Sequence, residues 1–304
     1  MADGRSRTLL WVLIGGGAFF LFVLAVFSIV YLTLHAGGGE TGGITSFGDR
    51  IGVVDLDGVI LSPQPVVGQL KKFGDDSSIK AIILHVNSPG GGVAASEEIY
   101  REVKRIRTEK KKKIVVSIES VGASGAYYVA SASDKIYADQ GSIVGSIGVI
   151  AQWVNYGDLL KWAKLKDVVI KTGEFKDTGN PARDLTSAEQ AYMQSLIDNM
   201  FAQFIQAVAD GRGLKYEEVK SFANGKVWSG EQAMSMKLID SVGDFETAVA
   251  ETAKSVGIKG EPTLVRPEKE RKTLLDLLLG DVSQYLPSRE KMLEQQVGFY
   301  YLWK

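Results

Sequence analysis

Two glycine-rich segments follow apolar stretches of the sequence, and both carry residues suited to hydrolytic chemistry. The first contains Asn87, Ser88 and Pro89 and continues through the three glycines 90–92. Consecutive glycines at a turn into a helix leave backbone N–H groups uncovered, which favours an anion or an oxyanion. A tight turn that only requires positive φ explains the same residues. A Walker-type phosphate loop is excluded, because no Gly-Lys-Ser/Thr follows the glycines.

The second segment reads Gly-Ala-Ser-Gly and places Ser124 close to the expected start of a helix. Small neighbours allow a substrate to approach closely, and the helix dipole favours a developing alkoxide, so Ser124 is a candidate nucleophile. The segment is not the hydrolase elbow G-x-S-x-G, because Ala126 stands where the last glycine is required. A serine that only caps the helix is the ordinary alternative.

The general base is the harder assignment. The chain has no cysteine, which excludes a thiol nucleophile, a disulfide framework and cysteine-bound metal, and its histidines are His35 and His85. His85 falls in an apolar strand pattern and His35 at the end of an apolar run, so neither is a convincing base. A lysine can replace imidazole if burial lowers its pKa from about 10.4 towards 7. Lys176, in a turn-rich segment, is a candidate that spacing alone does not single out.

The overall composition bounds the class of protein. With 304 residues, 45% of them hydrophobic, the chain is long enough for a sizeable core, and wholesale disorder is excluded. Lys+Arg 35 against Asp+Glu 36 gives a net charge of -1. No global positive field therefore recruits nucleic acid, which we exclude as a partner.

An N-terminal apolar run predicts a membrane anchor. Residues 9–34 carry no charge and exceed the roughly 20 apolar residues that cross a bilayer. Arg5 and Arg7 precede the run, and the next basic residue is Arg50. The positive-inside rule then predicts a cytoplasmic N-terminus (1–8), one pass through the cell (inner) membrane and an extracytoplasmic catalytic domain. A cleavable signal peptide is the alternative, although its apolar region typically spans roughly 7 to 15 residues.

The remaining sequence alternates strand and helix patterns, which is typical of an α/β protein with a largely parallel sheet. We expect a linker (35–50), a soluble domain (51–260) and a charged linker with an amphipathic tail (261–304) that contacts a partner or the membrane surface rather than the core. Thr186 and Glu189 form a capping box before a long helix. Strands are expected over 51–60, 79–87, 113–120, 135–140, 144–150 and 167–175, and helices over 93–109, 126–132, 187–210, 216–223 and 244–257.

Five motifs in sequence order carry a resemblance to a known family. They are NSPGGG, ESVGASGAYYVASASDKIYA, GSIVGSIGVI, GEFKDTGNPARDLT and a long helix that ends in ADGRG. From about residue 50 to 250, and with the N-terminal anchor, the chain resembles the bacterial signal peptide peptidase A (SppA) family in its short single-domain form. The resemblance implies a ClpP/crotonase-like fold and a Ser/Lys-dyad serine protease that degrades residual signal peptides, or other apolar peptides, in or near the membrane without a cofactor or metal.

The resemblance also implies a role for individual residues. Ser124 resembles the nucleophile, Lys176 the general base and Ser146 the hydroxyl that orients the lysine amine. The backbone N–H groups of Gly91 and Gly125 resemble the oxyanion hole. The family forms ring-like homo-oligomers in which neighbouring protomers contribute to one active site, so the same assembly is expected here.

Three other readings remain. Asp55 and Asp57, after an apolar strand, resemble the first motif of haloacid-dehalogenase-type phosphatases, but no later acidic pair stands at the expected place for magnesium. A non-catalytic membrane-anchored scaffold would use the tail for its partners. A related membrane Ser/Lys protease that clips stomatin-like partners usually carries further membrane helices, whereas no second run of about 18 apolar residues occurs here.

Overall fold

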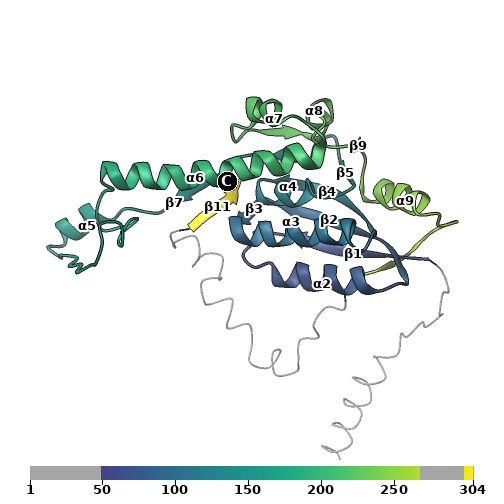
Figure 1. Ribbon diagram of the computed structural model, residues 1–304, viewed down its shortest axis with the longest axis horizontal. Helices are drawn as coiled ribbons and strands as arrows, with labels where there is room; N and C mark the ends of the chain where they lie inside the picture. The colour runs from purple at the N-terminus through teal and green to yellow at the C-terminus, as the bar shows by residue number, and fades with distance from the viewer. Residues whose placement is uncertain (1–48, 268–297, 304) are drawn as a thin grey trace, which may run out of the picture. The chain divides into compact units, whose positions relative to one another are not determined.

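A largely parallel β-sheet forms the centre of the computed structural model, which describes residues 49–267 and 298–303 (Figure 1). In this part of the chain the sheet has eight strands, with a path β10-β1-β2-β4-β5-β9 and with β6 and β8 joined beside β4. All pairs along the path are parallel, and only β6 with β8 is antiparallel. The strands are β1 (Arg50–Asp57), β2 (Ile79–Ser88), β4 (Lys113–Ala123), β5 (Lys135–Ala138), β6 (Ile143–Gly145), β8 (Val227–Ser229), β9 (Ser241–Val242) and β10 (Thr263–Val265).

Helices cover both faces of the sheet, which explains why the central strands are buried on both sides. α2, α3, α4 and α6 enclose the main apolar cluster, whereas α9 closes a smaller one with Ile51, Ile83 and Val249. The helices are α2 (Gln64–Asp75), α3 (Val93–Thr108), α4 (Gly125–Ala130), α5 (Gly157–Trp162), α6 (Ser187–Arg212), α7 (Tyr216–Phe222), α8 (Gly230–Ser235) and α9 (Phe245–Ser255). The predicted mixed α/β class is confirmed.

The predicted membrane segment (9–34), with the cytoplasmic end (1–8), lies outside the described residues, as does most of the linker 35–50. Among the residues that the structure describes, every helix is too short or too polar to cross a bilayer. The anchor therefore stays a prediction.

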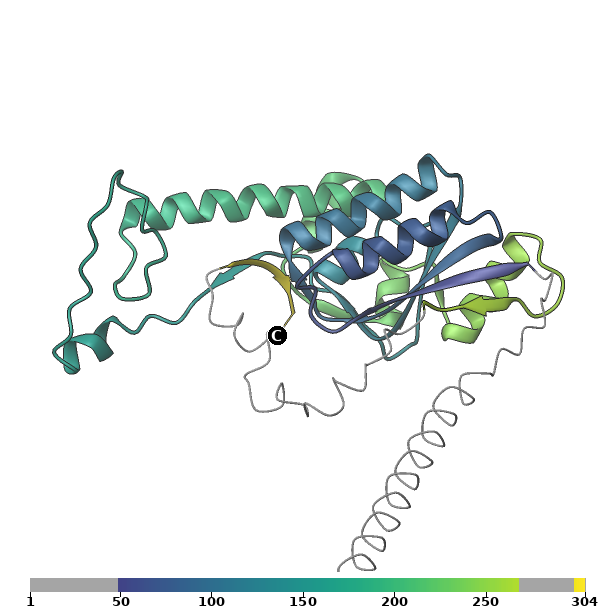
Figure 2. The ribbon, with the colours of Figure 1, turned by 90° about the horizontal axis from the view of Figure 1, so that it is seen from below.

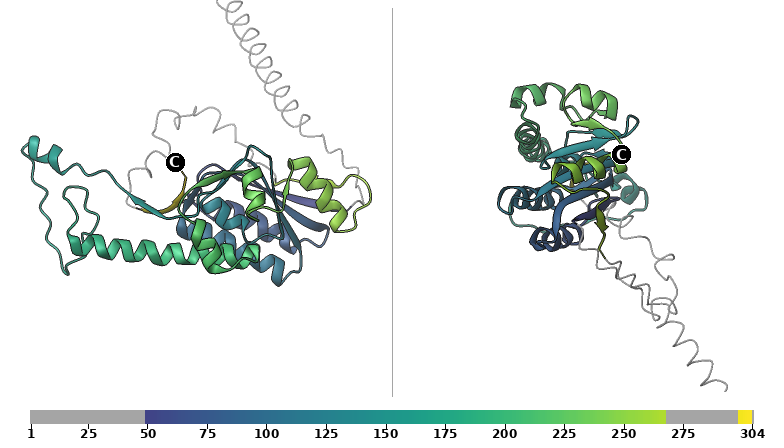
Figure 3. Two further views of the ribbon diagram at one scale, coloured as in Figure 1. Left: turned by 90° about the horizontal axis from the view of Figure 1, so that it is seen from above. Right: turned by 90° about the vertical axis from the view of Figure 1, so that its right-hand side faces the viewer.

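An arm formed by residues 153–186 stands clear of the sheet and carries α5 (Figures 2 and 3). The long helix α6 connects the arm to the core, and it begins at the predicted capping box of Thr186 and Glu189. The expected strand over 167–175 is wrong: the segment is irregular, and Ile170 is 97% exposed. The apolar residues that suggested a strand have no neighbouring strand to pair with.

A second, three-stranded sheet brings the end of the described chain to the middle of the molecule. In it β11 (Gly298–Leu302) lies between β3 (Gly90–Gly92) and β7 (Ile150–Gln152), antiparallel to both. Tyr301 of β11 is 1% exposed and belongs to the main apolar cluster. The expectation that the tail avoids the core is therefore wrong for this segment, because the tail provides a strand and a buried ring.

Candidate active site

Ser124 occupies a strained turn between β4 and α4. Its φ of 53° and ψ of -118° lie where a residue with a side chain is costly, by roughly 1–3 kcal/mol. The Ser124 N–H donates to the Gly145 carbonyl (2.7 Å), which holds the turn in place. Ser124 precedes α4, but its side chain makes no capping hydrogen bond, so the alternative of a simple capping serine is wrong. A strained strand-to-helix turn is the arrangement that presents a nucleophilic hydroxyl.

Ser146 lies beside Ser124 because the strands that precede them are paired. β4 and β6 are parallel, with Ala123 opposite Gly145, so the next residue of each strand leaves the sheet at the same edge. The predicted strand 144–150 is interrupted here, since β6 ends at Gly145 and β7 begins at Ile150. Ser146 also has positive φ (52°), and its N–H donates to the Lys226 carbonyl (2.8 Å).

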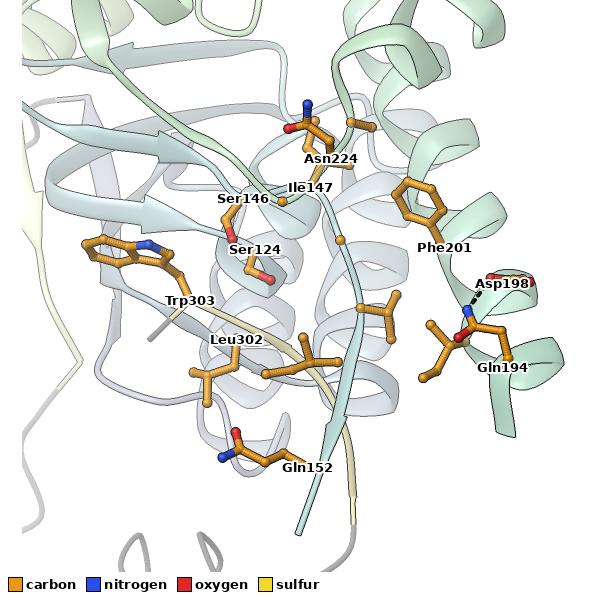
Figure 4. A pocket seen from close by; sticks show the side chains of 16 residues that line it. Ser124, Ser146, Ile147, Gln152, Gln194, Asp198, Phe201, Asn224, Leu302 and Trp303 are labelled. Atoms are coloured by element: carbon orange, nitrogen blue, oxygen red, sulfur yellow. Dashed lines mark hydrogen bonds between the residues drawn. The ribbon is translucent and has the colours of Figure 1, made fainter. Parts of the chain in front are cut away.

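The two serines line one wall of a cavity of about 590 Å³ (Figure 4). Most of the other wall residues are apolar, among them Ile147, Val149 and Phe201, and Asp198 and Gln194 lie at one side. Leu302 and Trp303 of the tail complete the lining. The cavity therefore suits an apolar ligand and holds two hydroxyls that can act on it.

The backbone N–H groups of Gly91 and Gly125 lie close together next to Ser124. A Cβ added to Gly125 would stand 3.1 Å from Gly91 N and 3.1 Å from the Tyr301 carbonyl oxygen. A Cβ added to Gly90, whose φ is +99°, would stand 2.6 Å from Gly125 N and collide with the same oxygen. Because positions 90 and 125 are glycines, the space beside these N–H groups can hold a carbonyl oxygen, and the Tyr301 carbonyl oxygen occupies it.

Lys176 is the predicted site residue that the structure does not bring to the others. It lies on the arm, is exposed, and is not among the residues that line the cavity of Ser124 and Ser146. In the described part of the chain, four of the five predicted site residues thus meet, and the fifth faces solvent. The burial that a lysine base requires is not supplied by the described residues of its own chain.

A partly buried ion-pair network, which sequence reasoning missed, holds the segment that carries Lys176. Arg183 Nη2 lies 3.0 Å from Asp177 Oδ2 and 2.6 Å from Glu189 Oε1, and Lys171 also pairs with Asp177. Hydrogen bonding from Arg183 holds the pKa of Glu189 far below its usual range, and bonding from Lys171 lowers the pKa of Asp177. The capping box was the only sequence signal for this network, because Glu189 both caps α6 and pairs with Arg183.

We expect acid to protonate the carboxylates of this network and so to destabilise the arm. A carboxyl whose pKa is lowered in the folded state stabilises it fully above the unfolded value, about 4.3 for Glu, and loses that contribution as the pH falls further. The protection factors for amide hydrogen exchange over residues 171–189, which compare the observed rate with the intrinsic rate at the same pH, should therefore fall below about pH 4. An Arg183→Met variant should show fast exchange already at pH 7.

The matched control is Arg101→Met, which removes an exposed pair with Glu97 and should leave exchange in the arm unchanged. Slow exchange in Arg183→Met at pH 7 would show that the network does not hold the arm.

The residues that resemble a phosphatase motif lie outside the cavity of Ser124, and Asp55 contacts other side chains. Arg266 Nη1 donates to both carboxylate oxygens of Asp55 (2.7 and 2.9 Å), and His85 Nδ1 lies 3.5 Å from the same carboxylate. Neither Asp55 nor His85 lines the cavity of Ser124. Within the described ranges, no group of three or more His, Asp or Glu side chains is placed to hold a metal ion.

Comparison with known proteins places the chain among peptidases. Residues 106–259 match the sequence profile of peptidase family S49, and residues 62–138 match that of Clp protease. A putative protease of Methanocaldococcus jannaschii is 38% identical over 211 residues, covering 69% of this chain and 67% of its own. A putative protease of Synechocystis is 35% identical (79% and 86%), and a putative signal peptide peptidase SppA of Enterococcus faecium is 36% identical (61% and 54%). These matches overturn the phosphatase reading.

Proposed function

Because this chain belongs to peptidase family S49 and is a serine peptidase, we propose that it is a membrane-anchored endopeptidase that degrades residual signal peptides with a Ser124/Lys176 dyad. One observation carries the proposal: Ser124 stands in a strained turn where two glycine N–H groups surround a peptide carbonyl. Nucleophile, oxyanion donors and carbonyl are the parts that acyl transfer requires.

In the proposed reaction the Ser124 hydroxyl attacks the carbonyl carbon of the scissile bond, and Gly91 and Gly125 donate hydrogen bonds to the oxyanion. An uncharged Lys176 amine takes the serine proton and then protonates the leaving amine. Ser146 orients that amine, a role its place beside Ser124 supports. Water activated by the same lysine hydrolyses the acyl-enzyme.

The position of Lys176 supports completion of the site by a neighbouring protomer. The arm that bears it exposes large apolar side chains, including Trp162 (82%) and Ile170 (97%), which monomers rarely expose in such number. Packing this surface against another copy would bury both the apolar residues and Lys176. A ring-like homo-oligomer in which each arm reaches the next cavity satisfies both requirements.

The substrate class follows from the cavity and the anchor. Apolar walls of Ile147, Val149, Ile150 and Phe201 suit the leucine- and alanine-rich core of a signal peptide. The predicted anchor (9–34) would hold the site beside the membrane where such remnants remain. The membrane protease that clips stomatin-like partners is the second candidate for the same dyad, and the two differ in substrate rather than in chemistry.

A fluorophosphonate probe that reacts with activated serines tests the proposal. We expect the detergent-solubilised full-length chain to be labelled at Ser124, with a rate that rises with pH because a lysine base acts only when uncharged. Chelators should leave labelling unchanged. Absence of labelling at every pH, in a chain that also cleaves no apolar peptide, would leave the non-catalytic scaffold as the better interpretation.

A further inference from the structure

We propose that Asp198 is a specificity-determining residue of the cavity, and that its carboxylate binds a lysine or arginine side chain of the peptide that is cut. The inference rests on the proposed function, because it concerns the same cavity as Ser124. It adds a second requirement on the substrate: besides an apolar segment, the preferred peptide carries a basic residue at a fixed distance from the cleaved bond.

Asp198 is the only charged side chain among the described residues that line this cavity. It belongs to α6, whose cavity-lining residues are spaced three or four positions apart: Gln194, Ile197, Asp198 and Phe201. Residues at this spacing share one face of a helix, so a single face of α6 forms this side of the cavity. Figure 4 shows Asp198 and Gln194 on the α6 side, apart from the turn that bears Ser124. A side chain of the bound peptide, rather than the reacting bond, therefore reaches this carboxylate.

One hydrogen bond orients the Asp198 carboxylate and leaves it able to bind a cation. Gln194 Nε2 donates to Asp198 Oδ1 (2.7 Å). A carboxylate has two oxygens that together accept about four hydrogen bonds, so most of its accepting capacity remains. Within the described chain, the lysine, arginine and histidine side chains that form salt bridges pair with other carboxylates. The negative charge of Asp198 thus has no cationic partner among these residues.

The apolar surface beside this carboxylate fits a long basic side chain. Lysine and arginine lay their apolar stems along apolar surface and keep the charged head in a polar place. Ile197 and Phe201 supply the apolar surface next to Asp198 on the same helix face. Signal peptides contain both parts, because a positively charged segment directly precedes their apolar core. A peptide with an acidic side chain at this position would be repelled.

The proposed general base is not the expected partner of Asp198. A nearby carboxylate stabilises the charged form of a lysine and so raises its pKa, whereas the base must be uncharged to take the Ser124 proton. A Lys176 amine paired with Asp198 would therefore be inactive. A basic side chain of the substrate has no such restriction, which favours the peptide over the arm of a neighbouring protomer as the source of the cation.

Pairs of short leucine-rich peptides that differ by one charge test the inference. Each pair carries lysine or its uncharged analogue norleucine at one position, every position is tested in turn, and both peptide ends are blocked. With the full-length enzyme we expect one position at which lysine raises kcat/KM about five-fold, the effect of a partly exposed ion pair. The difference should lie in KM, because Asp198 does not act on the reacting bond. It should shrink in about 1 M salt, where the Debye length is roughly 3 Å.

Two variants of Asp198 and one matched control assign this preference to the carboxylate. Asp198→Asn should cut the lysine and norleucine peptides at equal rates, and Asp198→Lys should instead favour glutamate at the same position. The control is Asp210→Asn. Asp210 lies on the same helix and likewise accepts a hydrogen bond from a glutamine four residues earlier, Gln206 (2.7 Å), but it does not line the cavity. Asp210→Asn should keep the wild-type preference for lysine.

The outcomes separate failure of this inference from failure of the proposed function. An enzyme that labels at Ser124 and cuts the norleucine peptides, but shows no lysine preference or keeps it in Asp198→Asn, would overturn the inference alone. A smaller assembly in Asp198→Asn, measured by size-exclusion chromatography with light scattering, would assign the carboxylate to a contact between protomers and would also overturn the inference. Loss of labelling and of all cleavage in the wild-type chain would overturn the proposed function and this inference with it.

Discussion

Mixing a Ser124→Ala variant with a Lys176→Ala variant is expected to restore peptidase activity that neither has alone. The structure places Ser124 in a buried turn and Lys176 on an exposed arm outside the cavity. Each single variant should lose about three orders of magnitude or more in kcat, as when one member of a catalytic unit is removed. In a mixed ring, some sites combine an intact serine with an intact lysine from the neighbour.

The size of the recovery is set by assembly statistics. In a head-to-tail ring formed at random from equal amounts of the two variants, about a quarter of the sites contain both intact residues. Co-refolded or co-expressed variants assayed with a fluorogenic apolar peptide should therefore approach a quarter of wild-type activity. The variants must be mixed before assembly, because preformed rings need not exchange subunits.

Two controls make this result specific. A Ser124→Ala/Lys176→Ala double variant mixed with either single variant should restore nothing, since every site then lacks one group. Lys166→Ala, an exposed lysine of the same arm, should keep full activity. Inactive mixtures, despite confirmed co-assembly, would argue that each protomer completes its own site.

A Gly125→Ala substitution keeps the backbone N–H of residue 125, but the added methyl group occupies the space beside it. We expect kcat to fall by about two to three orders of magnitude, the usual effect of losing one oxyanion hydrogen bond. The added Cβ would stand 3.1 Å from Gly91 N and 3.1 Å from the Tyr301 carbonyl oxygen. It would also collide with Ser96 Oγ. The new methyl group therefore crowds the space in which an oxyanion must fit. Steady-state kinetics together with the thermal midpoint measure the effect.

The contact with Ser96 gives this prediction an internal control. Ser96 is fully buried, and its hydroxyl has no hydrogen-bond partner in the described chain, so Ser96→Ala removes the collision at small cost. Gly125→Ala/Ser96→Ala should regain stability but not activity. Gly141→Ala, where an added Cβ meets no atom within 4 Å, should change neither. Full activity in the double variant would show that Gly125 is required only for packing.

Much of the fold could be predicted from local sequence. β2 and β4 are built around short apolar, β-branched runs, and α6 begins at the predicted capping box. The strand expected over 167–175 failed because apolar content predicts burial, whereas this arm exposes its apolar residues. Helix α2 was not predicted, because Pro65 and Gly68 obscure its apolar period.

The sequence by itself determined the composition of the site, because the order of the motifs around Ser124, Ser146 and Lys176 is a local property of the chain. Tertiary structure decided which of them meet: the pairing of Ala123 with Gly145 puts the two serines together, and the arm carries Lys176 away. It also decided that β11 returns to β3, across some two hundred residues of sequence. Backbone pairing over that separation depends on long-range packing, which no local pattern encodes.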